Sequence, residues 1–224
     1  MESYHYGHPG LGEACCSMSE QYQVRFWSVV GADLHRYGHG VSIKSFVRQY
    51  FLTPGFKYTF WMRLTLHLRH KKIIWRPGYY LCRVVLHHHS LKYGISISYN
   101  TCIGPGLYIG HYGGIVVNSE VVIGRDCNIN HEVTIGAKYG GKYPGIPVIG
   151  DRVYLGPGCK VIGGICLGND VAVGANSVVV DSVQDFGVVA GVPAAAADLA
   201  DQAAAARVFP HSHAHRQPAA LQAF

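Results

Sequence analysis

The sequence predicts a mainly β protein: a β-solenoid preceded by a small α-helical domain. Aliphatic residues recur every six positions in the second half, glycines follow many of them, and apolar residues in an earlier stretch have helical spacing. The chain has 224 residues, a formal net charge of +6, and 49% hydrophobic against 14% charged residues. This composition excludes a disordered chain, and the positive charge favours anionic partners such as phosphorylated cofactors, nucleic acid or acidic membrane surfaces.

Four regions follow one another along the chain. Residues 1–24 lack periodicity and are expected to form a loose N-terminal arm, and residues 25–94 are expected to form the helical domain. Residues 95–193 carry the repeat, and residues 194–224 form an Ala- and His-rich C-terminal tail. The N-terminus does not resemble a secretory signal, and no apolar run is long enough to span a membrane. The seven cysteines, an odd number without a C-x-x-C motif, indicate a reduced protein, so we expect a cytoplasmic location.

Two breaks divide the helical region. The first predicted helix carries Phe46, Val47, Tyr50 and Phe51 on one face and ends at residues 53–55. The second contains the apolar residues between 56 and 68 and precedes a break at residues 76–78, and a third short helix opens at Tyr80, Val84 and Val85. The aromatic and basic stretch 56–76 has two interpretations. It lies on a membrane surface, or it packs against the solenoid and neighbouring chains, which is the favoured interpretation.

The six-residue repeat runs in three series. The first is Ile97, Ile103, Ile109 and Ile115; the second is Val117, Ile123, Ile129 and Ile135; the third is Ile149, Leu155, Val161, Leu167, Val173 and Val179. One aliphatic side chain per short strand is expected to point inward and to stack on its equivalent in the next coil. Glycine is expected at the corners because it adopts unusual backbone angles at low cost.

Two interruptions of the repeat mark where function is expected. A two-residue slip between Ile115 and Val117 predicts a bulge just after His111, and residues 137–147 form a Gly-rich insertion. His131 follows Ile129 by two positions, as His111 follows Ile109. We therefore expect the two imidazoles on one face of the solenoid, one coil apart.

Four segments match a known pattern: IGPGLYIGHYGGIVV from position 103, NINHEVTIG from 128, PVIGDRVYLGPGCK from 147 and AGVPA from 190. Through them the chain resembles the hexapeptide-repeat acyltransferases. It is most similar to the serine acetyltransferase family, and within it to the branch of exopolysaccharide (colanic acid-type) biosynthesis. The resemblance implies a left-handed parallel β-helix, a homotrimer, acetyl-CoA as donor and a hydroxyl group as acceptor.

The resemblance also implies roles for single residues. His111 matches the catalytic histidine, Ser96 falls where the family has its catalytic aspartate, and Ile146 falls where it has a second, serine-contacting histidine. A histidine base removes the proton of a hydroxyl that attacks a thioester. We predict His111 as this base, with His131 and Ser96 as further catalytic residues. The candidate carboxylates that would orient His111 are Asp33, Glu120 and Glu132.

The cofactor is expected along the later coils, and no metal is required for this chemistry. The predicted acetyl-CoA-binding residues are Gly136, Gly156, Gly158, Lys160, Ala175, Gly191 and Pro193. Lys138 and Lys142 are more simply read as solvated charges. His87-His88-His89 and the HSHAH tail lack the spacing of a closed zinc site, so no metal site is predicted.

Three functions remain open at this point. The favoured one is acetyl transfer to a sugar hydroxyl in exopolysaccharide biosynthesis, by a cytoplasmic enzyme that works at the inner face of the membrane. The alternatives are a serine O-acetyltransferase and a non-catalytic solenoid scaffold. A nucleic acid is not expected as a partner.

Overall fold

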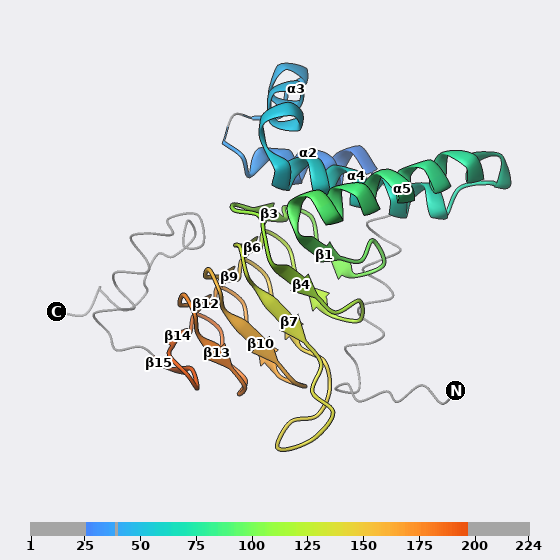
Figure 1. Ribbon diagram of the computed structural model, residues 1–224. Coiled ribbons are helices and arrows are strands. Elements are labelled where there is room, and N and C mark those ends of the chain that lie inside the picture. The colour runs from blue at the N-terminus through green and yellow to red at the C-terminus, as the bar shows by residue number, and fades with distance from the viewer. Residues whose placement is uncertain (1–25, 39, 197–224) are drawn as a thin grey trace.

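The computed structural model describes residues 26–38 and 40–196 (Figure 1). The arm expected at residues 1–24 and most of the expected C-terminal tail therefore lie outside the described residues. The described chain forms a group of helices followed by a parallel β-helix, as the sequence predicts. The helices cover the end of the β-helix at which its first coil begins (Figure 1).

The helical region contains α2 (Phe26–His35), α3 (Ile43–Leu52), α4 (Pro54–Arg69), the 3-10 helix η1 (Ile73–Trp75) and α5 (Arg76–Tyr93). Ser42 caps α3 by accepting a hydrogen bond from the backbone N–H of Ser45. Gly94, at a φ of 61°, ends α5 in the left-handed conformation. The break expected at residues 76–78 is the start of α5. A proline is tolerated there because backbone N–H groups in the first turn of a helix have no partner within the helix. The third helix is therefore longer than expected.

Short strands build each coil of the β-helix. They are β1 (Ile95–Ile97), β2 (Cys102–Ile103), β3 (Tyr108–Ile109), β4 (Ile115–Val117), β5 (Val122–Ile123), β6 (Asn128–Ile129), β7 (Thr134–Gly136), β8 (Val148–Ile149), β9 (Tyr154–Leu155), β10 (Lys160–Ile162), β11 (Cys166–Leu167), β12 (Ala172–Val173), β13 (Val178–Val179), β14 (Val188–Ala190) and β15 (Ala195–Ala196). They form three sheets, in the orders β1-β4-β7-β10-β13, β2-β5-β8-β11 and β3-β6-β9-β12-β14-β15. All of these pairs are parallel except that of β14 with β15.

The aliphatic series stack as predicted, with one change and one addition. In the third sheet Ile109, Ile129, Leu155, Val173 and Val189 stand in register. Ile115 does not continue the first series, because it pairs with Ile95 at the start of a new strand. The structure adds a second row of inward-facing side chains, which the six-residue series does not predict. Each of these residues is at most 1% exposed: Leu107, Val121, Cys127, Val133, Val153, Cys159, Ile165 and Val171.

The glycines that follow the aliphatic residues are explained by crowding rather than by backbone angles. None of Gly104, Gly124 and Gly150 has a positive φ. A Cβ on Gly124 would lie 2.6 Å from the carbonyl carbon of Gly150 in the next coil, and there are similar clashes at the other two. Successive coils thus approach too closely at this corner for any side chain. The corner residues at positive φ include non-glycine ones such as Asp126, at 58°.

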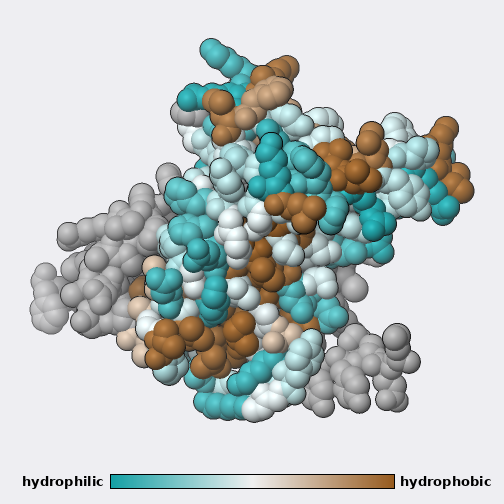
Figure 2. Space-filling view, viewed as in Figure 1, coloured by the Kyte–Doolittle hydropathy of each residue, from teal (hydrophilic) through white to brown (hydrophobic). Residues whose placement is uncertain are grey.

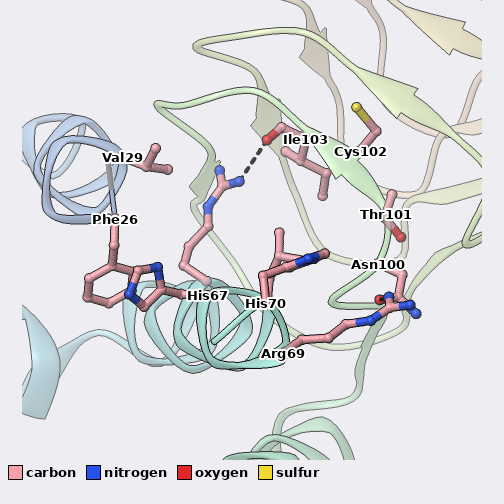
Figure 3. Close-up of a pocket in the computed structure, with 11 residues that line it drawn as sticks. Phe26, Val29, His67, Arg69, His70, Asn100, Thr101, Cys102 and Ile103 are labelled. Carbon is pink, nitrogen blue, oxygen red and sulfur yellow. Dashed lines mark hydrogen bonds between the residues drawn. The ribbon is translucent and has the colours of Figure 1, made fainter. Parts of the chain in front are cut away.

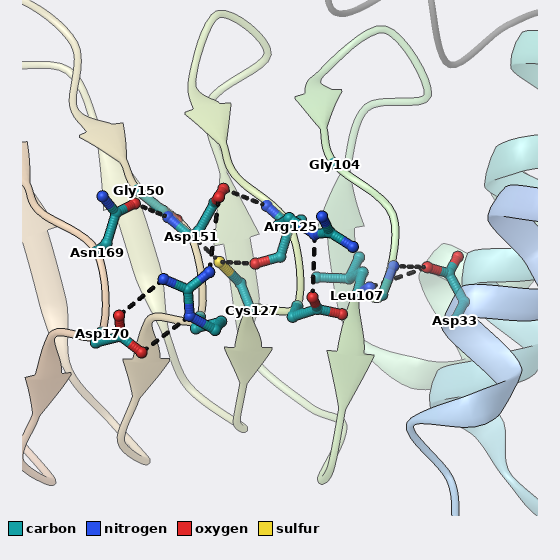
Figure 4. A network of polar contacts seen from close by, with 12 residues as sticks. Asp33, Gly104, Leu107, Arg125, Cys127, Gly150, Asp151, Asn169 and Asp170 are labelled. Atoms are coloured by element: carbon teal, nitrogen blue, oxygen red, sulfur yellow. Dashed lines mark hydrogen bonds and ion pairs between the residues drawn. The ribbon is translucent and has the colours of Figure 1, made fainter. Parts of the chain in front are cut away.

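Polar side chains tie the coils together along that corner. The N–H of Arg125 donates to Asp151 at 2.9 Å, and the N–H of Asp151 donates to the side chain of Asn169, also at 2.9 Å (Figure 4). Arg152 forms an ion pair with the buried Asp170 at 2.8 Å. The corner is therefore a ladder in which side chains of one coil satisfy backbone donors of its neighbour.

A buried ion pair joins the helices to the first coil. Arg63 of α4 lies 3.0 Å from Asp33 of α2 and donates to the carbonyls of Ile103 and Gly104, each at 2.7 Å. Asp33 also accepts hydrogen bonds from the backbone of residues 106 and 107 (Figure 4). Burial raises the pKa of the Asp33 carboxyl, and the Arg63 guanidinium opposes that shift. We call these two residues the Asp33–Arg63 clamp.

The buried face of α3 differs from the expected one, and α4 packs against the solenoid. On α3, Phe46 and Tyr50 pack towards α4, whereas Val47 and Phe51 are exposed. On α4, Phe56, Tyr58 and Met62 are buried, so this helix packs against the solenoid. No helix in the described part of the chain is both long and apolar enough to cross a lipid bilayer.

Candidate functional site

His111 and His131 lie next to each other, as their spacing predicts. They follow β3 and β6, which pair in register through Ile109 and Ile129. Their ring centroids are 5.8 Å apart with an angle of 83° between the planes, so the contact is edge-to-face. His111 is exposed and His131 is half-buried. A titratable side chain thus reaches solvent beside a second imidazole.

A glycine turn follows His111 and accounts for the predicted bulge. Gly113 and Gly114 have φ values of 109° and 65°, which L side chains rarely adopt. A Cβ on Gly114 would stand 3.0 Å from the side chain of Glu132, and the carbonyl of Gly113 accepts a hydrogen bond of 2.7 Å from the N–H of Glu132. The turn therefore packs tightly on the next coil, and its two glycines carry no side chain that could cover His111.

The register continues this corner into the later coils. Pro157, Ala175 and Gly191 follow Leu155, Val173 and Val189 by two positions, as the histidines follow their isoleucines. We call the column of residues 111, 131, 157, 175 and 191 the histidine corner. It has imidazoles on its first two coils and small or apolar side chains on the last three.

Most of the residues predicted to bind the cofactor lie on or beside the histidine corner. Gly158 donates its N–H to the carbonyl of His131 at 2.9 Å. Lys160 donates from its ammonium group to the carbonyl of Glu132. Gly156 is crowded, because a Cβ there would stand 2.6 Å from the carbonyl oxygen of Val173. Pro193 is exposed and follows the corner by two residues.

Gly136 and the Gly-rich insertion lie elsewhere. The insertion leaves the end of β7, at the opposite edge of the first sheet from the histidine corner. Lys138 and Gly145 exchange backbone hydrogen bonds of 2.9 and 2.8 Å, which close the loop. Lys142 pairs with Asp181 at 2.7 Å, and both side chains are mostly exposed. Within one chain, the two groups of residues predicted to bind the cofactor are therefore separated by the width of a sheet.

Ser96 and the candidate carboxylates do not contact His111. Ser96 is exposed on β1, in register with Val116 of β4. Among the described residues, no hydrogen bond or ion pair links His111 to a serine or a carboxylate. The suggestion that Asp33 orients His111 is wrong. Asp33 is only 1% exposed, and its carboxylate is paired with Arg63 in the clamp.

A cavity of about 220 Å³ lies on another side of the first coil. It is lined by residues of α2, α4 and the turn around β2, including Arg69, His70, Asn100 and Thr101 (Figure 3). Neither histidine of the histidine corner lines it. Within residues 26–38 and 40–196, no three His, Cys, Asp or Glu side chains are grouped closely enough to hold a metal ion. The HSHAH motif lies outside the described residues.

Known proteins of similar sequence and structure share this architecture. No protein-family model matches the chain. It is 39% identical to the serine acetyltransferase of Helicobacter pylori over 134 residues, which cover 59% of this chain and 74% of that protein. The structure resembles serine acetyltransferase of Neisseria gonorrhoeae in complex with serine, with a TM-score of 0.63 and 26% identity over 80% of this chain and 71% of the other. It also resembles the Brucella abortus enzyme in complex with coenzyme A, with a TM-score of 0.64 and 25% identity over 85% of this chain and 76% of the other.

These likenesses do not extend to the exopolysaccharide branch, since the relatives are named serine acetyltransferases. Sequence identity of 39% across nearly three quarters of a relative, together with a matching parallel β-helix, is sufficient to place the chain. The chain belongs to the serine acetyltransferase family, and it is an acyltransferase.

Proposed function

We propose that the protein transfers an acetyl group from acetyl-CoA to the hydroxyl group of L-serine. The observation that carries this proposal is the exposed His111 beside His131 on a glycine-lined corner, in a chain whose relatives act on serine. One similar structure holds serine and another holds coenzyme A, which supports both substrates. The sugar hydroxyl that the sequence favoured becomes the second candidate.

In this proposal His111 acts as the general base. Its free imidazole nitrogen accepts the hydroxyl proton while the oxygen attacks the thioester carbonyl carbon. The tetrahedral intermediate then collapses, the carbon–sulfur bond breaks, and the imidazolium returns the proton to the departing thiolate. The products are an O-acetyl ester and free CoA. Positioning supplies much of the rate, because a thioester is already reactive.

His131 and Ser96 would have supporting roles. The edge-to-face contact with His131 restricts how the His111 ring can turn, which favours one orientation for proton transfer. Ser96 offers a hydroxyl but no negative charge, so it cannot stabilise an imidazolium as a carboxylate would. A weaker base than the family's histidine–aspartate pair is therefore expected.

Acetyl-CoA would lie along the histidine corner. Ala175 and Gly191 would let the ligand approach the backbone beside Gly156 and Gly158, Pro193 would border the exit, and Lys160 would offer a positive charge to a phosphate. Gly136 belongs to the other edge of the first sheet. A homotrimer, which we also propose, would let that edge of one copy complete the corner of the next.

Ser96 and Ile146 support the second candidate, acetyl transfer to a sugar hydroxyl. Both replace family residues that handle serine or its proton, and Ile146 is a half-buried apolar side chain packed against the core. An acceptor other than an amino acid would not need those residues. The two candidates share His111 and acetyl-CoA and differ only in the acceptor, so a direct assay separates them.

The test measures CoA release by the purified protein with L-serine and with a panel of free sugars and nucleotide sugars. Turnover on serine is expected, and turnover on a sugar alone would replace the proposal by the second candidate.

His111→Ala should reduce kcat by about 10²–10⁴, while His87→Ala, at an exposed position on α5, should not change it. If the wild-type protein binds no acetyl-CoA, the scaffold alternative replaces both candidates.

A further inference from the structure

The outer end of the α4–α5 hairpin is exposed throughout. We call residues 69–77, with the sequence RHKKIIWRP, the hairpin tip, and every one of them is exposed. Ile73 is 71% exposed, Ile74 is 78% exposed and Trp75 is 54% exposed. Hydrophobic and hydrophilic residues gather side by side at this end of the hairpin (Figure 2). The first half of α4 behaves differently, since Phe56 and Tyr58 are buried against the protein.

The helical region that carries the hairpin tip has a large excess of positive charge, although Arg63 is paired with Asp33. No aspartate or glutamate occurs between Asp33 and Glu120, whereas residues 34–94 contain 11 lysines and arginines. Four of these cations, Arg69, Lys71, Lys72 and Arg76, belong to the hairpin tip. The tip therefore presents three large exposed apolar side chains with cations on both sides of them in the sequence, a combination that favours an anionic and partly apolar partner.

Three kinds of partner differ in how well they fit. A second copy of the same tip would bring together two sets of four cations, which repel each other. A nucleic acid would neutralise the cations but leave Ile73 and Ile74 in water. The surface of an anionic bilayer satisfies both features, because phosphate headgroups meet the lysines and arginines while the apolar side chains enter the boundary with the acyl chains.

We propose that the hairpin tip docks the protein onto anionic lipid membranes, with Ile73, Ile74 and Trp75 inserted and the four cations at headgroup level. The stretch 56–76 then has two separate roles: its first part packs on the solenoid, and its last part meets the lipid. This docking is independent of the acceptor that the enzyme uses.

The test measures binding of the full chain to phosphatidylcholine vesicles with and without phosphatidylglycerol, by co-sedimentation. Binding to the mixed vesicles is expected, with loss at high salt. Lys71→Glu changes the local charge by two units and should weaken binding by about tenfold or more. Arg125→Glu makes the same change in net charge on an exposed solenoid position and should leave binding within about twofold.

The apolar part is tested with Ile73→Ser/Ile74→Ser, which should weaken binding by about tenfold. A blue shift of tryptophan emission on adding mixed vesicles should be absent in Trp75→Phe. Acetyl transfer to a soluble acceptor and the circular dichroism spectrum should be unchanged in these variants, because the substituted side chains of residues 71 and 73–75 are exposed and none belongs to the histidine corner.

The proposal is overturned if the protein does not bind mixed vesicles, binds pure phosphatidylcholine equally well, or responds equally to Lys71→Glu and Arg125→Glu. It is also overturned if Ile73→Ser/Ile74→Ser lowers the molecular mass in solution, which would show that a second copy covers the tip. Binding of duplex DNA without binding of vesicles would assign the surface to nucleic acid instead. None of these outcomes depends on whether the enzyme acetylates serine.

Discussion

Two cysteines in the inner row of the solenoid connect single side chains to the stability of the fold. Cys127 and Cys159 are both 0% exposed, and burial raises the pKa of each thiol from about 9 to about 12. A group whose pKa is raised by folding stabilises the folded state at pH values below its unfolded pKa. That contribution is lost as the pH rises through the folded pKa.

We expect the free energy of unfolding to fall between about pH 9 and pH 12, and this fall to be shallower in Cys127→Ala/Cys159→Ala than in the wild type. The comparison uses the slope with pH, because the two cavities lower the absolute stability at every pH. Urea unfolding at a series of pH values measures it. Other titratable groups such as the partly buried Tyr37, whose pKa is also raised by desolvation, contribute equally to both proteins. Equal slopes would contradict the prediction.

Among single residues, the sequence predicts positions in the repeat well and partners across the fold poorly. The sequence predicts that His111 and His131 lie together, because both follow an isoleucine by two positions and coils stack in register, and the structure confirms it. Nothing in the sequence around Arg63 predicts that its side chain is buried, yet it is 7% exposed. Its partner Asp33 lies 30 residues away on another helix, so no local pattern joins the two.

At the level of elements, coil stacking at the glycine corner sets a limit on side-chain size. Gly124→Ala would place a methyl group 2.3 Å from Asp151 Oδ1 and 2.6 Å from the carbonyl carbon of Gly150. The coils would have to separate, and we expect a loss of at least about 1–3 kcal/mol in the free energy of unfolding. Thermal or urea denaturation measures this loss.

Gly140→Ala is the matched control for that prediction. It makes the same substitution in the insertion, where a Cβ would meet no atom within 4 Å and φ is not positive. We expect no loss of stability there. If both variants unfold like the wild type, then coil spacing adapts to a methyl group and the explanation of the glycine column by crowding fails.

The element boundaries show where a periodic pattern is sufficient and where it is not. The six-residue series predicts the strands because one inward position per strand repeats regularly within each of the three series. The six-residue series does not predict the second inner row, in which Cys127 and Cys159 stand among the aliphatic residues. The sequence does not predict the start of α5 correctly, because a proline can either end a helix or begin one. Only the packing of the chain decides between these two roles.

For the molecule as a whole, the Asp33–Arg63 clamp connects the helical region to the solenoid. Arg63 donates to two carbonyls of the first coil, and Asp33 accepts from two N–H groups of the same coil, so each bridges both parts. A buried pair of this kind contributes little net energy compared with an apolar replacement, but losing one member leaves an uncompensated buried charge.

Asp33→Ala should therefore lower the free energy of unfolding by about 3–5 kcal/mol, and the double substitution Asp33→Ala/Arg63→Met should recover part of that loss. Asp181→Ala is the control, because its pair with Lys142 is exposed and is expected to contribute at most about 1 kcal/mol. Chemical denaturation followed by circular dichroism measures all three variants. The helices contribute most of that signal, so early loss of helix in Asp33→Ala would show that they separate from the solenoid first. If Asp33→Ala instead costs no more than Asp181→Ala, hydrophobic contacts of α4 alone hold the helices in place, and the clamp would have no such role.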